Sequence, residues 1–521
     1  MRNNRASWLA AALLALTAPF PAAAQAAPAP HLSAPHLGAA LARLEQDALK
    51  AAGPGGIPGL AIAVVDQDRV IYLKGFGVRE VGRPGRVDPD TVFQIASVSK
   101  PIASTIVARL VGEGVVGWDD PVVRHDPGFE LSEPAATREV TLRDLFSHHS
   151  GLPELAPDLL EDLGFRREDI LYRLRYLPLP KGFRGQYAYS NFGLTEGAVA
   201  AAKAAGKTWE DLAAETLYRP LGMTSTSSRV ADYRAAGNRA SLHVLEGGRY
   251  VAKFQRDPDA ESPAGGVSST VRDLSRWVRL HLGGGRFEGR QLIDRGALSQ
   301  TYLPEAVSSP PGDAALDRAG FYGLGWDVNY DAAGRVRLSH SGAFSLGAAT
   351  CVMLVPSAQL GIVVLTNAAP VGVPETLART FLDVALDGRP ERDWAPLYRR
   401  AFEELTASFR GGTDYSRPPT APAPALPPAS YVGTYTNPFY GDVQVVERGG
   451  RLTLVIGPGR VAFPLSHYHR DLFTFQTLGE SAGSLSGATF LIGPGQTATS
   501  LVIEYLDVVG QGTFTRVANR T

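Results

Sequence analysis

The chain has 521 residues, 44% of them hydrophobic, and its 51 basic and 52 acidic side chains leave a net charge of -1. This composition is typical of a globular protein, and the near-zero charge argues against nucleic acid or another acidic polymer as the main partner. The chain is longer than a domain built on one hydrophobic core usually is, so at least two domains are expected.

The first 26 residues have the layout of a secretory signal. Arg2 and Arg5 precede an apolar run over 8–19 that is short for a membrane span, and small residues around Ala24 suit cleavage. We expect residues 1–26 to be removed and the mature protein to be periplasmic or secreted, with no transmembrane span. An uncleaved membrane anchor is the alternative.

Residues 35–410 are predicted to form one domain, in which early and late strands share a sheet around a helical insert. The predicted strands cover residues 59–65, 70–76, 336–338, 348–355 and 361–366. The predicted flanking helices cover residues 37–51, 374–387 and 394–408.

A second domain is predicted after a proline-rich linker over 411–428. Residues 429–521 alternate short apolar segments with glycine-rich turns, which is typical of a small all-β barrel or sandwich. The predicted strands there cover residues 433–436, 443–447, 452–456, 473–476, 489–492, 501–505 and 512–516.

Ser97 and Lys100 are the first candidates for a catalytic pair. A serine hydroxyl becomes a good nucleophile when a neighbouring base takes its proton. The run after Pro101 keeps helical spacing to Gly112, and proline is tolerated only in a first turn. Ser97 is therefore expected at a helix N-terminus, with the Lys100 amine one turn away. Burial can lower a lysine pKa from about 10.4 far enough to make the amine a base.

Tyr189 and Asn191 lie in a polar and aromatic loop before a predicted helix over 194–204. A phenol and an amide two residues apart can point into one cleft. The phenol would relay a proton to the leaving group, and the amide would hold the substrate.

His340, Ser341 and Gly342 are expected where a strand ends. The imidazole can polarise or orient a substrate, and the glycine allows close approach to the backbone. The N–H of Ala343 would then join the N–H of Ser97 as a two-donor oxyanion hole.

Together these segments resemble the serine β-lactamase-like superfamily, which includes class C β-lactamases, D-alanyl-D-alanine carboxypeptidases, D-aminopeptidases and related esterases. Its Ser-x-x-Lys, Tyr-x-Asn and Lys/His-x-Gly motifs match Ser97–Lys100, Tyr189–Asn191 and His340–Gly342, within roughly residues 37–400. The resemblance implies an α+β fold with an antiparallel sheet and a large helical region. The part after the linker resembles the lipocalin-like barrel appended to some members.

The resemblance also implies a serine hydrolase that works through an acyl-enzyme, exported if residues 1–26 are a signal, and we expect no cofactor. Ser97 would attack, Lys100 would accept its proton, and Tyr189 would pass that proton on. The substrate, a small molecule or peptide, would be an ester, an amide or a D-amino-acid peptide, bound by Asn191 and the His340–Gly342 motif. His340 replaces a lysine of many β-lactamases, which favours the esterase or aminopeptidase branches.

Competing interpretations remain. The protein could instead be a penicillin-binding or sensing protein that is acylated but turns over little, with the β-domain as a binding module. The stretch 479–483 fits a Gly-x-Ser-x-Gly nucleophile elbow, but that fold needs a histidine downstream, and the last one is His469. We expect no metal, because the adjacent His148 and His149 point apart on regular structure and His467-Tyr-His469 lacks a third ligand. Cys351 is expected to be a buried thiol.

Overall fold

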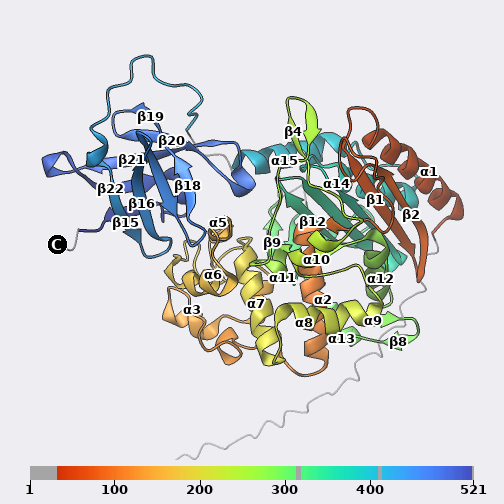
Figure 1. Cartoon of the computed structure of the whole chain (residues 1–521). Coiled ribbons are helices and arrows are strands. Elements are labelled where there is room, and N and C mark those ends of the chain that lie inside the picture. Colours follow the sequence, from red (N-terminus) through yellow and green to blue (C-terminus); the bar gives the residue numbers. More distant parts are fainter. Residues whose placement is uncertain (1–31, 313–317, 409–412, 519–521) are drawn as a thin grey trace, which may run out of the picture.

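An eight-stranded antiparallel sheet organises the larger part of the protein (Figure 1). The computed structural model describes residues 32–312, 318–408 and 413–518, so the signal predicted for residues 1–26 lies outside the described residues. The strand order is β2-β1-β14-β13-β12-β11-β10-β9. Strand β1 (Gly59–Asp66) pairs with both β2 (Arg69–Gly77) and the late strand β14 (Leu360–Thr366), which confirms a sheet built from both ends of the domain.

The remaining strands of this sheet come from the second half of the domain. They are β9 (Ala306–Ser309), β10 (Gly320–Tyr322), β11 (Asp327–Tyr330), β12 (Val336–Phe344) and β13 (Ala348–Val355). The predicted end of a strand at residue 338 is wrong, because β12 continues to Phe344 and stays paired with the buried strand β13. On its other edge, β12 pairs with β11 only as far as Ser339. The segment 340–344 is therefore free on that edge.

Helices cover both faces of the sheet. One core cluster joins α1 (Ala34–Ala51) and α14 (Val373–Asp387) to the sheet, as their apolar spacing predicts. A second cluster on the other face includes α2 (Ser99–Gly112) and α12 (Val271–Leu282). The other helices are α3 (Pro134–Glu139), α4 (Leu142–Phe146), α5 (Asp158–Asp162), α6 (Arg167–Arg173), α7 (Asn191–Ala204), α8 (Trp209–Ala213), α9 (Arg219–Leu221), α10 (Val230–Ala235), α11 (Ser262–Gly265), α13 (Arg295–Gln300) and α15 (Ala395–Ser408).

The C-terminal part is a nine-stranded antiparallel sheet that curls into a nearly closed barrel, with β18 and β19 at its two ends. Its strands are β15 (Gly433–Asn437), β16 (Gly441–Arg448), β17 (Arg451–Ile456), β18 (Val461–Pro464), β19 (Ser466–His469), β20 (Leu472–Gln476), β21 (Leu485–Ile492), β22 (Ala498–Ile503) and β23 (Thr513–Arg516). The sequence predicted seven of these strands and missed β18 and β19, which are only four residues long.

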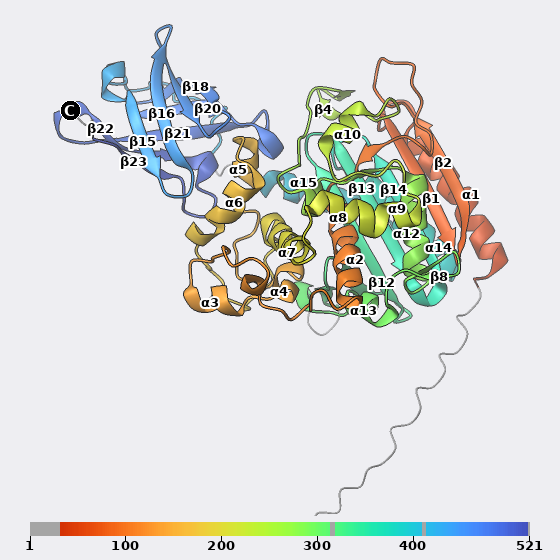
Figure 2. The same ribbon diagram turned by 60° about the horizontal axis from the view of Figure 1, so that its bottom comes forward.

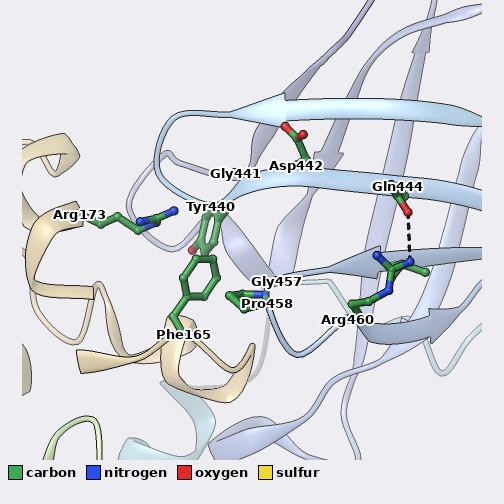
Figure 3. A pocket seen from close by; sticks show the side chains of 10 residues that line it. Phe165, Arg173, Tyr440, Gly441, Asp442, Gln444, Gly457, Pro458 and Arg460 are labelled. Atoms are coloured by element: carbon green, nitrogen blue, oxygen red, sulfur yellow. Dashed lines mark hydrogen bonds between the residues drawn. The ribbon is translucent and has the colours of Figure 1, made fainter. Parts of the chain in front are cut away.

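The barrel docks on the helical region through α5 and the loop that follows it, as Figure 2 shows. The Gly459 N–H donates to the Leu163 carbonyl at 3.2 Å. Figure 3 shows the neighbouring contact, where Phe165 points toward Tyr440 beside a hollow of about 300 Å³. Within the described ranges, no helix combines the length and apolar character required to cross a bilayer.

Candidate active site

Ser97 lies in a single 3-10 turn, η1 (Ala96–Val98), directly before α2. Two flanking hydrogen bonds fix this turn through Ile95. The Thr350 hydroxyl on β13 donates to the Ile95 carbonyl at 2.7 Å, and the Ile95 N–H donates to the Val267 carbonyl at 3.0 Å. Ala96 has a φ of 47°, which is uncommon for a residue with a Cβ. The turn presents Ser97 half-exposed while its neighbours are buried.

The Lys100 amine is fully buried and donates to three oxygen atoms. Its Nζ lies 3.0 Å from Ser97 Oγ, 2.6 Å from Asn191 Oδ1 and 3.0 Å from the Ala264 carbonyl. The predicted pair is therefore in direct contact, and the contact follows from the spacing of three residues across the start of α2.

Burial lowers the pKa of Lys100 to about 8, although the negative charges of Glu261 and Asp158 act in the opposite direction. Desolvation outweighs the carboxylates because the amine has no contact with solvent. At neutral pH an appreciable fraction of this lysine is a free amine.

Tyr189 lies just before α7, where the Ser190 hydroxyl caps the helix by accepting from the Gly193 N–H at 3.1 Å. The Tyr189 hydroxyl lies near the Ser97 side chain, and burial raises the pKa of this phenol well above its usual value. The Lys100 ammonium nitrogen lies 4.5 Å from the centre of the Tyr189 ring. Tyr189 is thus a neutral phenol that can donate a proton beside Ser97.

His340 points to the same cleft from β12, and both of its ring nitrogens are engaged. Nδ1 lies 2.8 Å from the Ser341 carbonyl, which only accepts, so Nδ1 carries the proton. Nε2 then accepts from the Tyr322 hydroxyl at 2.9 Å. Burial and the Lys100 charge lower the pKa of His340 to about 3, so the imidazole is neutral.

The Gly342 position brings β12 against the Ser97 turn. A Cβ there would lie 2.2 Å from the Ile95 carbonyl and 3.1 Å from the Ser97 nitrogen. Ala343 follows on the edge that β11 leaves free. The Ser341 side chain lies on the other face, beside Cys351 in the core cluster that contains α14, so the structure does not bring that hydroxyl to Ser97.

Three further residues near the site were not predicted as site residues. Asp158 accepts a hydrogen bond from Asn191 Nδ2 at 2.7 Å. Tyr322 holds His340. His148, whose ring lies 4.5 Å from that of Tyr189, accepts from the Ser190 N–H at 3.2 Å. No sequence signal marks Asp158 as a site residue.

The remaining candidates lie as follows. Residues 479–483 hold one 3-10 turn, η7 (Gly479–Ser481), with neither strand nor helix forming an elbow. Cys351 is a free, buried thiol. In the part of the chain that the structure describes, no group of three or more His, Cys, Asp or Glu side chains is arranged to hold a metal ion.

Comparison with known proteins gives a consistent result. The beta-lactamase family profile matches residues 41–387, and a domain of unknown function, DUF3471, matches residues 417–514. An unguisins hydrolase from Aspergillus campestris is 26% identical over 483 residues, covering 86% of each chain. Protein flp from Staphylococcus aureus is 24% identical over 323 residues, covering 62% of each chain.

Among solved structures, the octameric penicillin-binding protein homologue from Pyrococcus abyssi aligns with a TM-score of 0.58 at 20% identity. The alignment covers 91% of this chain and all of that one. At this identity the likeness concerns the fold alone.

Proposed function

Because the chain belongs to the beta-lactamase family, whose members include hydrolases, we propose that it is a serine hydrolase that forms an acyl-enzyme on Ser97. The observation that carries this proposal is the buried Lys100 amine, 3.0 Å from Ser97 Oγ and with its pKa lowered to about 8. A hydroxyl beside a partly deprotonated amine is an activated nucleophile.

The proton path follows from the neighbours of Ser97. The free amine of Lys100 takes the Ser97 proton as Oγ attacks the substrate carbonyl. Tyr189, a neutral phenol near Ser97, then supplies a proton to the leaving group and recovers one from the catalytic water during deacylation. In that second step Lys100 returns its proton to the departing Ser97 oxygen, which restores the free enzyme. The phenol is not the initial base, because its raised pKa keeps it protonated.

The developing oxyanion is assigned to the N–H groups of Ser97 and Ala343. The close approach at Gly342 supports this assignment, since it puts the free edge of β12 beside the Ser97 turn. Fixed donors aimed at the developing charge are commonly the largest single contribution to catalysis in such sites.

The proposed substrates are esters, amides or D-amino-acid peptides, with Asn191 and the segment around His340 binding the acyl side. His340 is neutral and both its nitrogens are engaged, so it offers no cation for a substrate carboxylate. This favours an esterase or aminopeptidase activity over β-lactamase activity.

The test is a substrate screen with p-nitrophenyl esters, nitrocefin and D-amino-acid amides. Turnover of at least one class is expected, and Ser97→Ala and Lys100→Ala should each abolish acylation. Ser299→Ala, on the exposed surface of α13, is the control and should be fully active. A stoichiometric adduct on Ser97 without turnover would instead favour the sensing function, and an unaltered acylation rate in Lys100→Ala would contradict the assigned base.

We also propose that the barrel restricts the size of the substrates that the site accepts. A cavity of about 430 Å³ lies between the two parts, bounded by Phe254 and Leu346 on one side and by Leu478 and Ala482 on the other. Gln476→Trp, on the cavity wall, should reduce turnover of long-chain esters more than that of acetyl esters. Thr436→Trp, exposed on β15, is the control; equal effects of Gln476→Trp on both substrates would contradict restriction.

Export is a separate proposal that rests on the signal-like residues 1–26. Mass spectrometry of the mature protein from the expressing cell should find a chain that begins close to residue 27. An intact Met1 in the exported or membrane fraction would favour the anchor.

A further inference from the structure

The three acceptors around Lys100 constrain how its amine can act as a base. A protonated amine has three N–H groups, one for each acceptor at 2.6–3.0 Å. The free amine has two N–H groups and one lone pair. It can accept the Ser97 proton only if both N–H groups go to Asn191 Oδ1 and the Ala264 carbonyl, so that the lone pair faces Ser97.

The orientation of the Asn191 amide therefore decides where the lone pair points. With Oδ1 toward Lys100, the amide accepts an N–H and leaves the lone pair for Ser97. With the amide turned over, its NH₂ group would donate to the lone pair and compete with the serine hydroxyl.

Asp158 fixes this orientation. Its Oδ2 accepts from Asn191 Nδ2 at 2.7 Å, and a carboxyl oxygen in this position favours the NH₂ side of the amide. Oδ2 can accept in either protonation state, since Oδ1 can carry a proton. Oδ1 is buried and, within the described residues, has no hydrogen-bond partner, so the bond to Asn191 is the contact that this carboxyl group makes with the site.

We propose that Asp158 is a positioning residue for acylation, which acts through Asn191 to direct the Lys100 lone pair at Ser97. The inference rests on the proposed function, because it concerns the proton transfer that forms the acyl-enzyme. Asp158 is the first residue of α5, the helix on which the barrel docks. The orientation of the Lys100 lone pair therefore depends on an element outside the sheet and α2.

The test compares two substitutions of similar size in the full-length protein. Asp158→Leu removes the acceptor and should slow single-turnover acylation of Ser97 by roughly 10- to 100-fold, the usual cost of misplacing a catalytic group. Asp158→Asn keeps an acceptor oxygen and should recover most of the wild-type rate. Asp169→Leu, at a more exposed position on α6, is the control and should acylate normally.

A double-mutant cycle separates positioning from general damage. In an Asn191→Ala background, Asp158→Leu should slow acylation no further, because the residue through which it acts is gone. Additive losses, or a wild-type rate in Asp158→Leu, would overturn the inference. If Asp158→Leu does not fold, as judged by its thermal unfolding, a poor acylation rate in folded Asp158→Asn would overturn it. A wild-type protein that forms no Ser97 adduct would instead refute the proposed function.

Discussion

At the scale of single residues, the site depends on the balance between burial and charge at Lys100. Three acceptors and two nearby carboxylates favour the ammonium, whereas loss of solvent favours the free amine. Burial prevails, and a pKa of about 8 in place of 10.5 increases the free amine at pH 7 by roughly two orders of magnitude.

A pH dependence follows from this balance. Because only the deprotonated amine accepts the Ser97 proton, kcat/KM should rise about tenfold per pH unit below about 8 and level off above it. The measurement is kcat/KM for a neutral ester between pH 4 and 10, so that the substrate does not titrate. A kcat/KM that stays level across this whole range would contradict Lys100 as the base and would fit His340, whose pKa is lowered to about 3.

Sequence spacing predicted the residues whose relation is local, and missed those whose relation is tertiary. Ser97 and Lys100 share a helix start, so their contact follows from a spacing of three residues. Asp158 meets Asn191 across 33 positions, where the first residue of α5 lies beside the first residue of α7. Nothing in the local pattern around Asp158 differs from an ordinary helix start.

At the scale of elements, the site forms where the Ser97 turn lies against the free edge of β12. The sequence predicted the strand only to residue 338, because His340, Ser341 and Gly342 are small or polar and suggest a strand end. Pairing along the whole of β13 outweighs that local preference. The absence of β11 beyond Ser339 then leaves backbone groups available beside Ser97.

Gly342→Ala tests this contact. The new Cβ would lie 2.2 Å from the Ile95 carbonyl and 2.3 Å from Thr350 Oγ1, so the turn and the strand must move apart. We expect kcat/KM to fall by roughly 100-fold, because an oxyanion donor displaced by about 1 Å loses most of its effect. Gly38→Ala in α1, where the Cβ meets nothing within 4 Å, is the control and should retain full activity. Full activity of Gly342→Ala would show that the Ala343 N–H is not an oxyanion donor.

At the scale of the whole molecule, one buried arginine joins the barrel to the catalytic part. Arg256, with a side chain 7% exposed, forms ion pairs with Glu161 and with Asp162 at 2.9 Å, both on α5. It also lies 3.2 Å from Glu261 and 3.7 Å from Glu480 of the barrel. The other oxygen of Glu480 accepts from the N–H of Ser345, two residues beyond Ala343. The contact between the barrel and the catalytic part therefore extends to the end of β12, the strand that borders the site.

Removing this cation should destabilise the protein in a pH-dependent way. Arg256→Met leaves four carboxyl groups without their shared partner, and breaking a buried pair in this manner costs about 3–5 kcal/mol. Burial already raises the pKa values of Glu161 and Asp162, and that of Glu480 to about 7. Loss of the arginine raises them further, since its charge acts in the opposite direction.

An acid whose folded pKa exceeds its unfolded value binds a proton more tightly when folded, so its contribution to stability falls as pH rises between the two values. The loss of unfolding free energy in Arg256→Met should therefore be larger at pH 8 than at pH 5, as measured by urea titration. Arg166→Met, whose ion pair is 77% exposed at the arginine, should change stability by less than about 1 kcal/mol at either pH. An equal loss at both pH values would show that the carboxyl groups near Arg256 do not take up protons when the arginine is removed.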